Sequence, residues 1–257
     1  MLVIDDLHYQ VANKAILNAI SFRVPESTFL VIVGPNGSGK STLIRCLSGW
    51  YQPSRGNISF NNDPLRQMTS PERAENISFL PQRPRLSESI PIVDVIGAAR
   101  FRFNESPKKR RAKALEILRS RGLEHLGSRD HHSLSGGEAQ RVALACLRAQ
   151  DSKIWLLDEP ANHLDPAVQK RMYSDLCREW QEGRTIVTVT HNLNLIMEAI
   201  SPQQHKHVQV IGLKNGELYF DIALSDQTLT KKIGKLYGLP TKKMAAFDRD
   251  YFVFGRP

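Results

Sequence analysis

The chain has 257 residues, enough for one large domain, or one domain with a modest insert, around a substantial core. Its hydrophobic content of 41% and charged content of 24% are close to those of folded domains, which excludes a disordered or fibrous chain. Lys and Arg number 35 against 26 Asp and Glu, a net charge of +9 that points to an anionic partner. Nucleic acid, a phosphorylated ligand and a membrane surface all fit that charge.

Apolar stretches such as 29–33 and 185–189 are much shorter than the roughly 18 to 20 residues that a membrane-crossing helix needs. The first residues, MLVIDD, have no basic segment leading into an apolar one, so we expect no export signal. Three cysteines form no C-x-x-C pair, and we expect reduced thiols in the cytoplasm: Cys46, Cys146 and Cys177.

The chain order of the elements predicts an α/β protein. Strand-like segments at 2–9, 16–24 and 28–33 are followed by glycines and by a helix over 42–47, which is how a parallel α/β unit opens. Two further strand and helix pairs are predicted at 154–157 with 166–180, and at 185–190 with 193–200.

An inserted helical region is predicted between these units, from about 86 to 132. Its segments 92–103 and 108–121 read as polar, basic helices. Near the end of the chain, a hairpin is predicted over 208–213 and 217–220, and a last helix over 229–237 that stops at Gly238.

Residues 34–41, GPNGSGKS, match the pattern G-x-x-x-x-G-K-[ST] between a strand and a helix, and are called the phosphate loop here. Glycines let successive backbone N–H groups and the positive end of the helix face phosphate oxygens. Lys40 would contact the β and γ phosphates, and the Ser41 hydroxyl would ligate Mg²⁺. The predicted nucleotide contacts here are Gly34, Asn36, Gly37, Ser38, Gly39, Lys40, Ser41 and Thr42.

Residues 154–159, IWLLDE, form an apolar strand that ends in two carboxylates. Because side chains alternate along a strand, Asp158 and Glu159 can divide their roles. Asp158 is predicted to face Mg²⁺, and Glu159 the water that attacks the γ-phosphate.

The segment LSGGE at 134–138 precedes a helical run. Together with the phosphate loop, the Asp-Glu strand, Gln82 and His191, it resembles the ATP-binding subunits of ABC transporters over nearly the whole chain. The resemblance implies a P-loop NTPase core, a mixed sheet flanked by helices, with an antiparallel β subdomain and an inserted α-helical subdomain. It also implies ATP and Mg²⁺ as cofactors.

In this family, the LSGGE of one subunit closes over the ATP held by its partner's phosphate loop, since a helix N-terminus offers a second anion site. The residues that the resemblance assigns to this cap are Ser135, Gly136, Gly137 and Glu138. The chain carries one phosphate loop and one LSGGE, so the resemblance implies a nucleotide-dependent homodimer, or a heterodimer with a similar ATPase.

The resemblance assigns four more positions. Tyr9 would stack on adenine, an interaction worth roughly 1–3 kcal/mol per base. Gln82 would join Mg²⁺ or the attacking water to the helical insert, and His191 would contact the γ-phosphate beside Glu159. Asp165 lies in the segment NHLD that crosses the dimer seam in the family. The chain departs from the family pattern at Ala161, where a hydroxyl residue is common.

The other histidines receive no role. The pairs His131 with His132 and His205 with His207 have no Cys, Asp or Glu partner at ligand spacing, so no metal beyond Mg²⁺ is expected.

Within the family, four segments resemble importers of iron-siderophore complexes, heme and cobalamin: 87–102, 162–165, 191–194 and 236–240. The implied partners are a second ATPase copy, transmembrane permease subunits and, indirectly, a substrate-binding protein, with no nucleic acid. The implied location is the cytoplasmic face of the cell membrane, where the protein would be peripheral.

Other functions stay open: a cassette for a zinc or manganese importer, an exporter, or a soluble ATPase that acts on nucleic acid or ribosomes. The basic run 108–111 fits either a phosphate backbone or a solvated helix face. The soluble class usually joins two cassettes or inserts a long coiled coil, and this chain does neither. We predict an ATP-binding domain over 1–240, with its helical subdomain at about 86–150, and a C-terminal tail, 241–257, that folds back onto its own domain or a neighbour.

Overall fold

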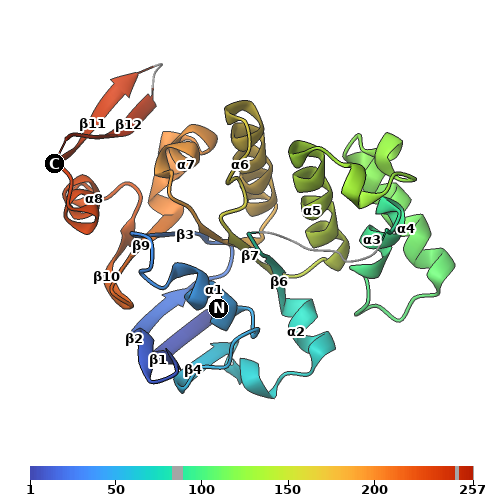
Figure 1. The fold of residues 1–257 in the computed structure, drawn as a ribbon, viewed down its shortest axis with the longest axis horizontal. Coiled ribbons are helices and arrows are strands. Elements are labelled where there is room, and N and C mark those ends of the chain that lie inside the picture. The colour runs from blue at the N-terminus through green and yellow to red at the C-terminus, as the bar shows by residue number, and fades with distance from the viewer. Residues whose placement is uncertain (83–88, 247–248, 257) are drawn as a thin grey trace.

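A computed structural model describes residues 1–82, 89–246 and 249–256, arranged in two main sheets with helices between and around them (Figure 1). The first sheet is antiparallel, in the order β2-β1-β4-β5, and the second has six strands in the order β10-β9-β3-β8-β7-β6. The strands are β1 (Leu2–Val11), β2 (Lys14–Val24), β3 (Phe29–Val33), β4 (Arg55–Phe60), β5 (Asp63–Pro64), β6 (Ile77–Leu80), β7 (Ile154–Asp158), β8 (Thr185–Val189), β9 (Val208–Lys214), β10 (Glu217–Ala223), β11 (Thr241–Ala246) and β12 (Arg249–Phe254).

The helices pack on both faces of the six-stranded sheet. They are α1 (Lys40–Leu47), α2 (Ser70–Asn76), α3 (Ile92–Ala98), α4 (Pro107–Ser120), α5 (Gly136–Gln150), α6 (Pro166–Gln181), α7 (Leu193–Ala199) and α8 (Leu229–Tyr237), with short 3₁₀ turns at Leu65–Gln67, Glu124–Leu126, His131–Ser133 and Pro202–His207. Within the described residues, no helix combines the length and the apolar character needed to cross a bilayer.

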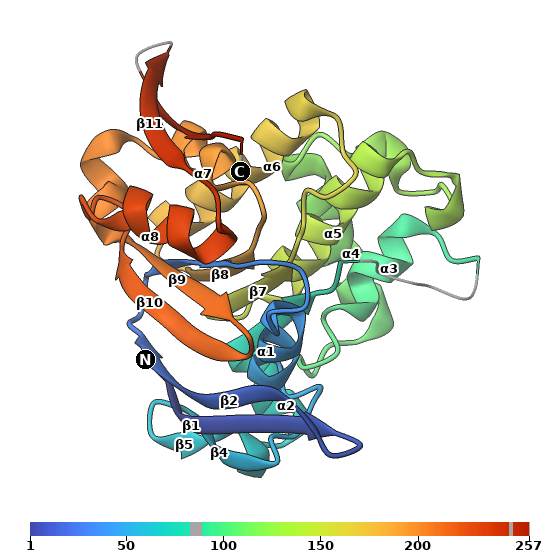
Figure 2. The same cartoon turned by 60° about the vertical axis from the view of Figure 1, so that its left-hand side comes forward.

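The three central strands of the six-stranded sheet are buried along their whole length. Every residue of β3, β7 and β8 is buried, as parallel strands covered on both faces require. Helix α1 lies between the two sheets (Figure 2), and the core there includes Leu43, Leu47 and the sheet residue Leu30. The opposite face packs against α5, α6 and α7, while α3, α4 and part of α5 share a separate core. The predicted fold class, with its antiparallel and helical subdomains, is confirmed.

One predicted helix is too long. The helix expected over 92–103 ends at Ala98, because the chain turns there and Arg100 and Arg102 donate to carbonyl groups at the C-terminus of α5. The helix expected over 108–121 is confirmed within one residue as α4. The short elements β4, β6 and α2 were not predicted. Residues 86–88, at the start of the expected insert, lie outside the described part of the chain.

The tail forms a hairpin, β11–β12, that packs on α7. Asn194 donates from Nδ2 to the Phe252 carbonyl over 3.1 Å and accepts from the Phe252 N–H over 2.8 Å. The Phe252 ring is buried in the main core, and Arg249 donates to carbonyl groups near the end of α7. The expectation that the tail folds back onto its own domain is therefore confirmed for the described residues, which exclude 247 and 248.

Candidate nucleotide-binding site

The carboxyl ends of four parallel strands bring the predicted site residues to one edge of the sheet. Strands β6, β7, β8 and β3 all run in the same direction. Gln82 follows β6, Asp158 ends β7, His191 follows β8, and the phosphate loop follows β3. Ligands of open α/β sheets bind at this edge.

The phosphate loop requires glycine where the chain turns most sharply. Gly39 has a φ of 100°, and a Cβ there would lie 2.7 Å from Leu17 Cδ2. A Cβ at Gly34 would lie 2.3 Å from the Leu213 carbonyl oxygen. The loop lines a cavity of about 500 Å³, whose walls are Lys14, Ala15, Ile16, Asn36, Gly37, Gly39, Lys40, Ser41, Thr42, Glu159, Asn215 and Gly216.

Lys40 is folded back onto its own loop. Its Nζ donates to the carbonyl oxygens of Gly34, over 2.8 Å, and Pro35, over 2.9 Å. Burial lowers the pKa of Lys40, while the nearby charges of Glu159 and Asp158 oppose that shift. The ammonium group therefore lies beside the cavity. Phosphate oxygens can replace the two carbonyl oxygens as its hydrogen-bond acceptors.

Asp158 and Ser41 lie together as two possible oxygen ligands for a metal ion, and one carboxylate oxygen has no hydrogen-bond partner among the described residues. Asp158 is fully buried, and its Oδ1 accepts from Ser41 Oγ over 3.0 Å. Its Oδ2 has no hydrogen-bond partner among the described residues, and Arg45 Nη2 is 4.0 Å away. Burial raises the pKa of Asp158. An orphaned carboxylate oxygen beside a hydroxyl fits Mg²⁺, which prefers oxygen ligands.

Glu159 is held by three side chains. Its Oε1 lies 2.7 Å from His191 Nε2, and its Oε2 accepts from Gln82 Nε2 and Asn162 Nδ2, each over 2.8 Å. Its backbone has a φ of 49°, in the left-handed region. The hydrogen bond from Asn162 to Glu159 was not predicted. The sequence does hold a local signal for it, because Asn162 follows Glu159 by three residues.

The segment LSGGE forms a second, separate cavity. Ser135 caps α5 in a reciprocal arrangement with Glu138, whose N–H donates to Ser135 Oγ and whose Oε2 accepts from the Ser135 N–H. Ser135, Gly137 and Glu138 line a cavity of about 190 Å³ that shares no lining residue with the phosphate-loop cavity. One chain therefore does not bring the two halves of the predicted site together.

The remaining predicted residues lie around these cavities. The Tyr9 ring stacks on Tyr51, with centroids 5.2 Å apart and an interplanar angle of 6°, and does not line the phosphate-loop cavity. Asp165 is exposed at the N-terminus of α6. Ser38 is buried and its Oγ has no partner among the described residues, and Gly136 begins α5.

The prediction that His131 and His132 have no Asp partner was wrong. Potential ligand atoms of Asp130, His131 and His132 all lie within 4.8 Å of one another. The sequence analysis overlooked Asp130 because side chains of consecutive residues usually diverge, and here a 3₁₀ turn gathers them.

Comparison with known proteins agrees with this geometry. The family model for ABC transporters matches residues 17–162. A hemin import ATP-binding protein of Bordetella avium is 36% identical over 74% of this chain and 76% of its own. A petrobactin import ATP-binding protein of Bacillus anthracis is 34% identical, with coverages of 70% and 68%, and the ferric enterobactin transport ATP-binding protein of Escherichia coli is 30% identical, with 86% and 80%.

Solved structures give the same result for the fold. A dimeric ATP-binding cassette in a post-hydrolysis state, bound to ADP and Pi, superposes with a TM-score of 0.75 at 26% identity, covering 87% of this chain and 99% of that one. A transporter described as being of the metal-chelate type, in an inward-facing conformation, has a TM-score of 0.82 at 23% identity, with coverages of 99% and 97%. The chain belongs to the ABC transporter family and is one of its ATP-hydrolysing subunits.

Proposed function

We propose that this protein powers an importer of iron-siderophore complexes, heme or cobalamin. The observation that carries the proposal is the convergence of Gln82, Asn162 and His191 on Glu159, beside the phosphate loop. The similar proteins named for hemin, petrobactin and enterobactin import support the substrate class. The permease subunits are separate chains in this proposal.

Nucleotide binding begins at the phosphate loop. Backbone N–H groups of the loop and of the first turn of α1 bind phosphate oxygens, and Lys40 leaves its carbonyl partners for the β and γ phosphates. Ser41, Asp158 and Gln82 would hold Mg²⁺. When bound, Mg²⁺ neutralises the charge that develops on the phosphate oxygens.

Glu159 is the proposed general base for the attacking water. Its three partners hold the carboxylate in one orientation, so that an oxygen can accept a proton from water in line with the γ-phosphate. His191 is 41% exposed at the side chain, and in this scheme it would donate to the γ-phosphate as well as orient Glu159. Asn162 is a positioning residue in this scheme.

Two copies of the chain would complete each site. The phosphate-loop and LSGGE cavities are separate within one chain, so a partner has to supply Ser135, Gly136 and Gly137 to the γ-phosphate. Glu138 would hold Ser135 in place, and Asp165 would lie at the seam. Tyr9, whose ring stacks on Tyr51, would also stack on adenine. We propose a homodimer on these grounds.

Closure of the dimer would move the permease through the helical subdomain. Gln82 bonds Glu159 and directly precedes the segment that leads to α3, so the nucleotide state can reach that subdomain through one side chain. In this proposal the protein would lie at the cytoplasmic face of the cell membrane, with a substrate-binding protein as an indirect partner. We propose residues 1–240 as the motor, with 241–257 as an appended tail.

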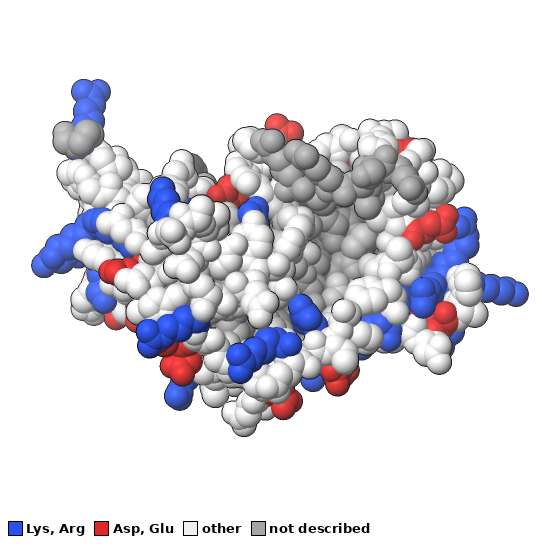
Figure 3. Space-filling view, turned by 60° about the horizontal axis from the view of Figure 1, so that its bottom comes forward, with Lys and Arg blue, Asp and Glu red and all other residues white. Residues whose placement is uncertain are grey.

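Among the residues that the structure describes, one face of the molecule does not carry the continuous basic stripe that binding to a nucleic acid backbone would favour (Figure 3). On the face drawn in Figure 3, Lys and Arg lie in separate groups around the rim, several of them beside Asp or Glu, rather than in one continuous stripe. A groove for a nucleic acid backbone needs such a stripe.

The test uses a Glu159→Gln variant, which keeps the shape of the site and removes the base. With saturating MgATP, light scattering should report a dimer, and ATP should remain unhydrolysed. Purification of the same trapped variant from membranes should recover a polytopic protein. A variant that stays monomeric with MgATP, both alone and with its permease, contradicts the proposal, and recovery with ribosomes or DNA favours the soluble alternative.

A further inference from the structure

A small turn ahead of the LSGGE segment gathers three side chains that the nucleotide site does not use. Asp130 accepts from the His132 N–H over 2.7 Å and so begins the 3₁₀ turn His131–Ser133. A bridge between Pro91 and Asp130 joins this turn to the start of α3. The turn is therefore anchored to the helical subdomain on one side and to α5 on the other.

The Asp130 carboxylate accepts from the His132 N–H and from Ser89 Oγ, but within the described residues no hydrogen bond joins the three side chains to one another. The rings of His131 and His132 have centroids 3.8 Å apart. His131 Nδ1 lies 3.8 Å from Asp130 Oδ1, which is too long for a hydrogen bond. Two ligands bound at about 2.1 Å to one tetrahedral ion lie about 3.4 Å apart, so a movement of a few tenths of an ångström would let an ion bridge this gap. The third ligand comes from His132, whose exposed ring can turn toward the other two.

His131 supplies an independent observation. Its side chain is 14% exposed, and neither Nδ1 nor Nε2 has a hydrogen-bond partner among the described residues. Burial of unpaired polar atoms is costly, and an unsatisfied group in a folded protein calls for an explanation such as a bound water or ion. An ion on Nδ1 would satisfy one of the two nitrogens.

We propose that Asp130, His131 and His132 form a binding site for a divalent first-row transition metal ion of the Zn²⁺ class. Two imidazoles and one carboxylate favour such an ion, whereas an oxygen-only donor set favours Mg²⁺ or Ca²⁺. None of the three residues lines the phosphate-loop cavity, so this site is distinct from the Mg²⁺ position at Asp158.

The position of the site gives it a defined structural effect. Arg129, next to Asp130, donates to Ser133 Oγ over 3.3 Å and to Glu138 Oε1 over 3.1 Å. The Glu138 carboxylate in turn accepts hydrogen bonds from the N–H and the Oγ of Ser135. A metal ion on the turn would fix the segment that carries these contacts, and therefore the N-terminus of α5.

Binding can be measured without reference to ATPase activity. The untagged full chain, free of Mg²⁺ and nucleotide, is titrated with Zn²⁺ in competition with a chromophoric chelator, and with Co²⁺ followed by its visible absorption. We expect one saturable equivalent. Loss of an outer-shell partner costs a metal site about 10–100-fold in affinity, so His131→Gln with His132→Gln should cost at least that much.

Two control variants locate the site. His205→Gln with His207→Gln removes the other pair of histidines that are close in sequence, and His191→Gln removes the imidazole at Glu159. Both variants should bind Zn²⁺ as the unaltered chain does. Asp130→Asn keeps an acceptor for the His132 N–H and should still lose affinity at least about 10-fold, which keeps the test valid if the double variant does not fold. Absence of saturable binding, unchanged binding in the variants at 130–132, or loss of binding in either control overturns the proposal.

Discussion

His191 Nε2 lies 2.7 Å from Glu159 Oε1, while the other oxygen of the same carboxylate accepts from Gln82 and Asn162. One carboxylate thus receives partners from the ends of β6 and β8 and from its own loop. A carboxylate fixed by groups on three segments responds to the relative position of those segments. The proposed base and the proposed link to the helical subdomain are therefore the same hydrogen-bonded group.

His191→Ala should slow ATP turnover more than it weakens ATP binding. The substitution removes the contact with Oε1 and leaves the bonds from Gln82 and Asn162 in place. General acid-base groups contribute about 10²–10⁴-fold to the rate of the chemical step. We expect the rate of ATP turnover to fall by a factor within this range. Steady-state hydrolysis and nucleotide affinity measured on the same preparation check this, with His207→Ala as the control. Equal turnover in the two variants would contradict the role of His191.

Lys40→Ala should weaken nucleotide binding itself. In the folded chain Lys40 bonds two carbonyl oxygens of its own loop, and in the proposed scheme ATP binding would replace these bonds with phosphate contacts. Bonds between charged groups are about twice as strong as neutral ones, so their loss should appear in the dissociation constant. Fluorescent-nucleotide titration gives that constant, with the solvated Lys108→Ala as the control. An unchanged affinity would mean that the phosphates lie elsewhere.

Asp158→Asn should remove the response to Mg²⁺. The Asp158 Oδ2 is buried without a hydrogen-bond partner in the described chain, whereas Oδ1 bonds Ser41. Asparagine retains an acceptor for Ser41 and removes the charge that attracts the cation. With ATP present, added Mg²⁺ should raise the Tm of the unaltered chain and leave that of the variant nearly unchanged. An equal rise in both proteins would exclude Asp158 as a metal ligand.

The raised pKa values of the three cysteines predict that the free energy of unfolding depends on pH. Burial raises the pKa values of Cys46, Cys146 and Cys177 to about 12, from an ordinary value of about 8.5. Because the folded state holds these protons more tightly, their contribution to stability is complete below about pH 8.5 and is lost as the pH rises toward 12.

Thiol labelling checks the same point. At pH 8 the native chain should react slowly with a thiol reagent, and urea should expose three reactive groups. Because Cys46 lies on α1, MgATP should slow its labelling further. Rapid reaction of the native chain at pH 8 would show that the thiols are accessible without unfolding.

Local motifs account for what the sequence predicts well. The phosphate loop follows β3, and Glu159 and His191 follow neighbouring parallel strands, so a pattern of residues is enough to place them at one edge. Asn162 and Asp130 escape prediction because their contacts depend on the turn conformation, with a φ of 49° at Glu159 and a 3₁₀ turn after Asp130.

Tertiary contacts account for the other differences. The stacking of Tyr9 on Tyr51 joins segments that are distant in the sequence, and no spacing rule indicates it. Strand β6 has four residues and β4 follows a polar loop, so neither has enough periodicity to be recognised. The helix over 108–121 was predicted within one residue because its 14 residues are long enough to show a helical pattern.

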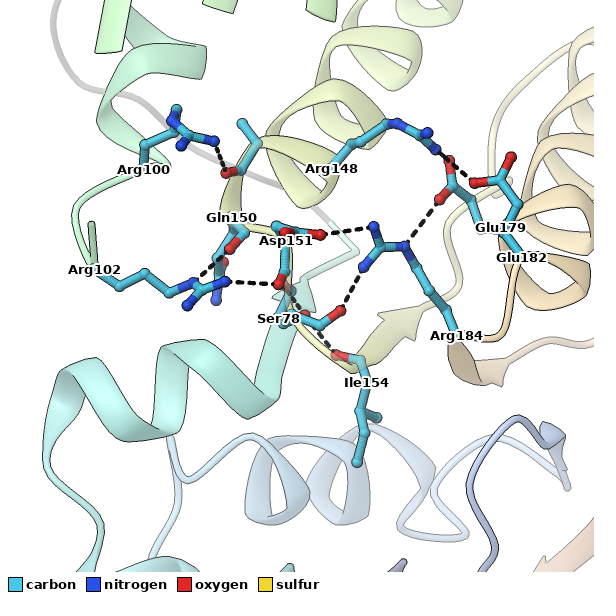
Figure 4. Close-up of polar contacts among 12 residues, drawn as sticks. Ser78, Arg100, Arg102, Arg148, Gln150, Asp151, Ile154, Glu179, Glu182 and Arg184 are labelled. Carbon is cyan, nitrogen blue, oxygen red and sulfur yellow. Dashed lines mark hydrogen bonds and ion pairs between the residues drawn. The ribbon is translucent and has the colours of Figure 1, made fainter. Parts of the chain in front are cut away.

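Glu179 is the position where a single substitution should cost most stability. Its side chain is 3% exposed and forms ion pairs with Arg121, Arg148 and Arg184, which lie just after α4, on α5 and just before β8 (Figure 4 labels the last two). Arg184 also donates to Asp151 and to the Ser152 carbonyl. One carboxylate thus holds the helical subdomain against the sheet.

Glu179→Gln keeps the volume of the side chain and leaves three guanidinium groups around a neutral amide. Removing one partner of a buried ion pair costs about 3–5 kcal/mol, and we expect the free energy of unfolding in urea to fall by that amount. Glu182→Gln is the matched control, since Glu182 also pairs with Arg148 but is 49% exposed at the side chain. Exposed pairs contribute about 0–1 kcal/mol, so the two variants should differ clearly. Equal losses in both would mean that Arg148 alone, rather than the buried carboxylate, holds the junction together.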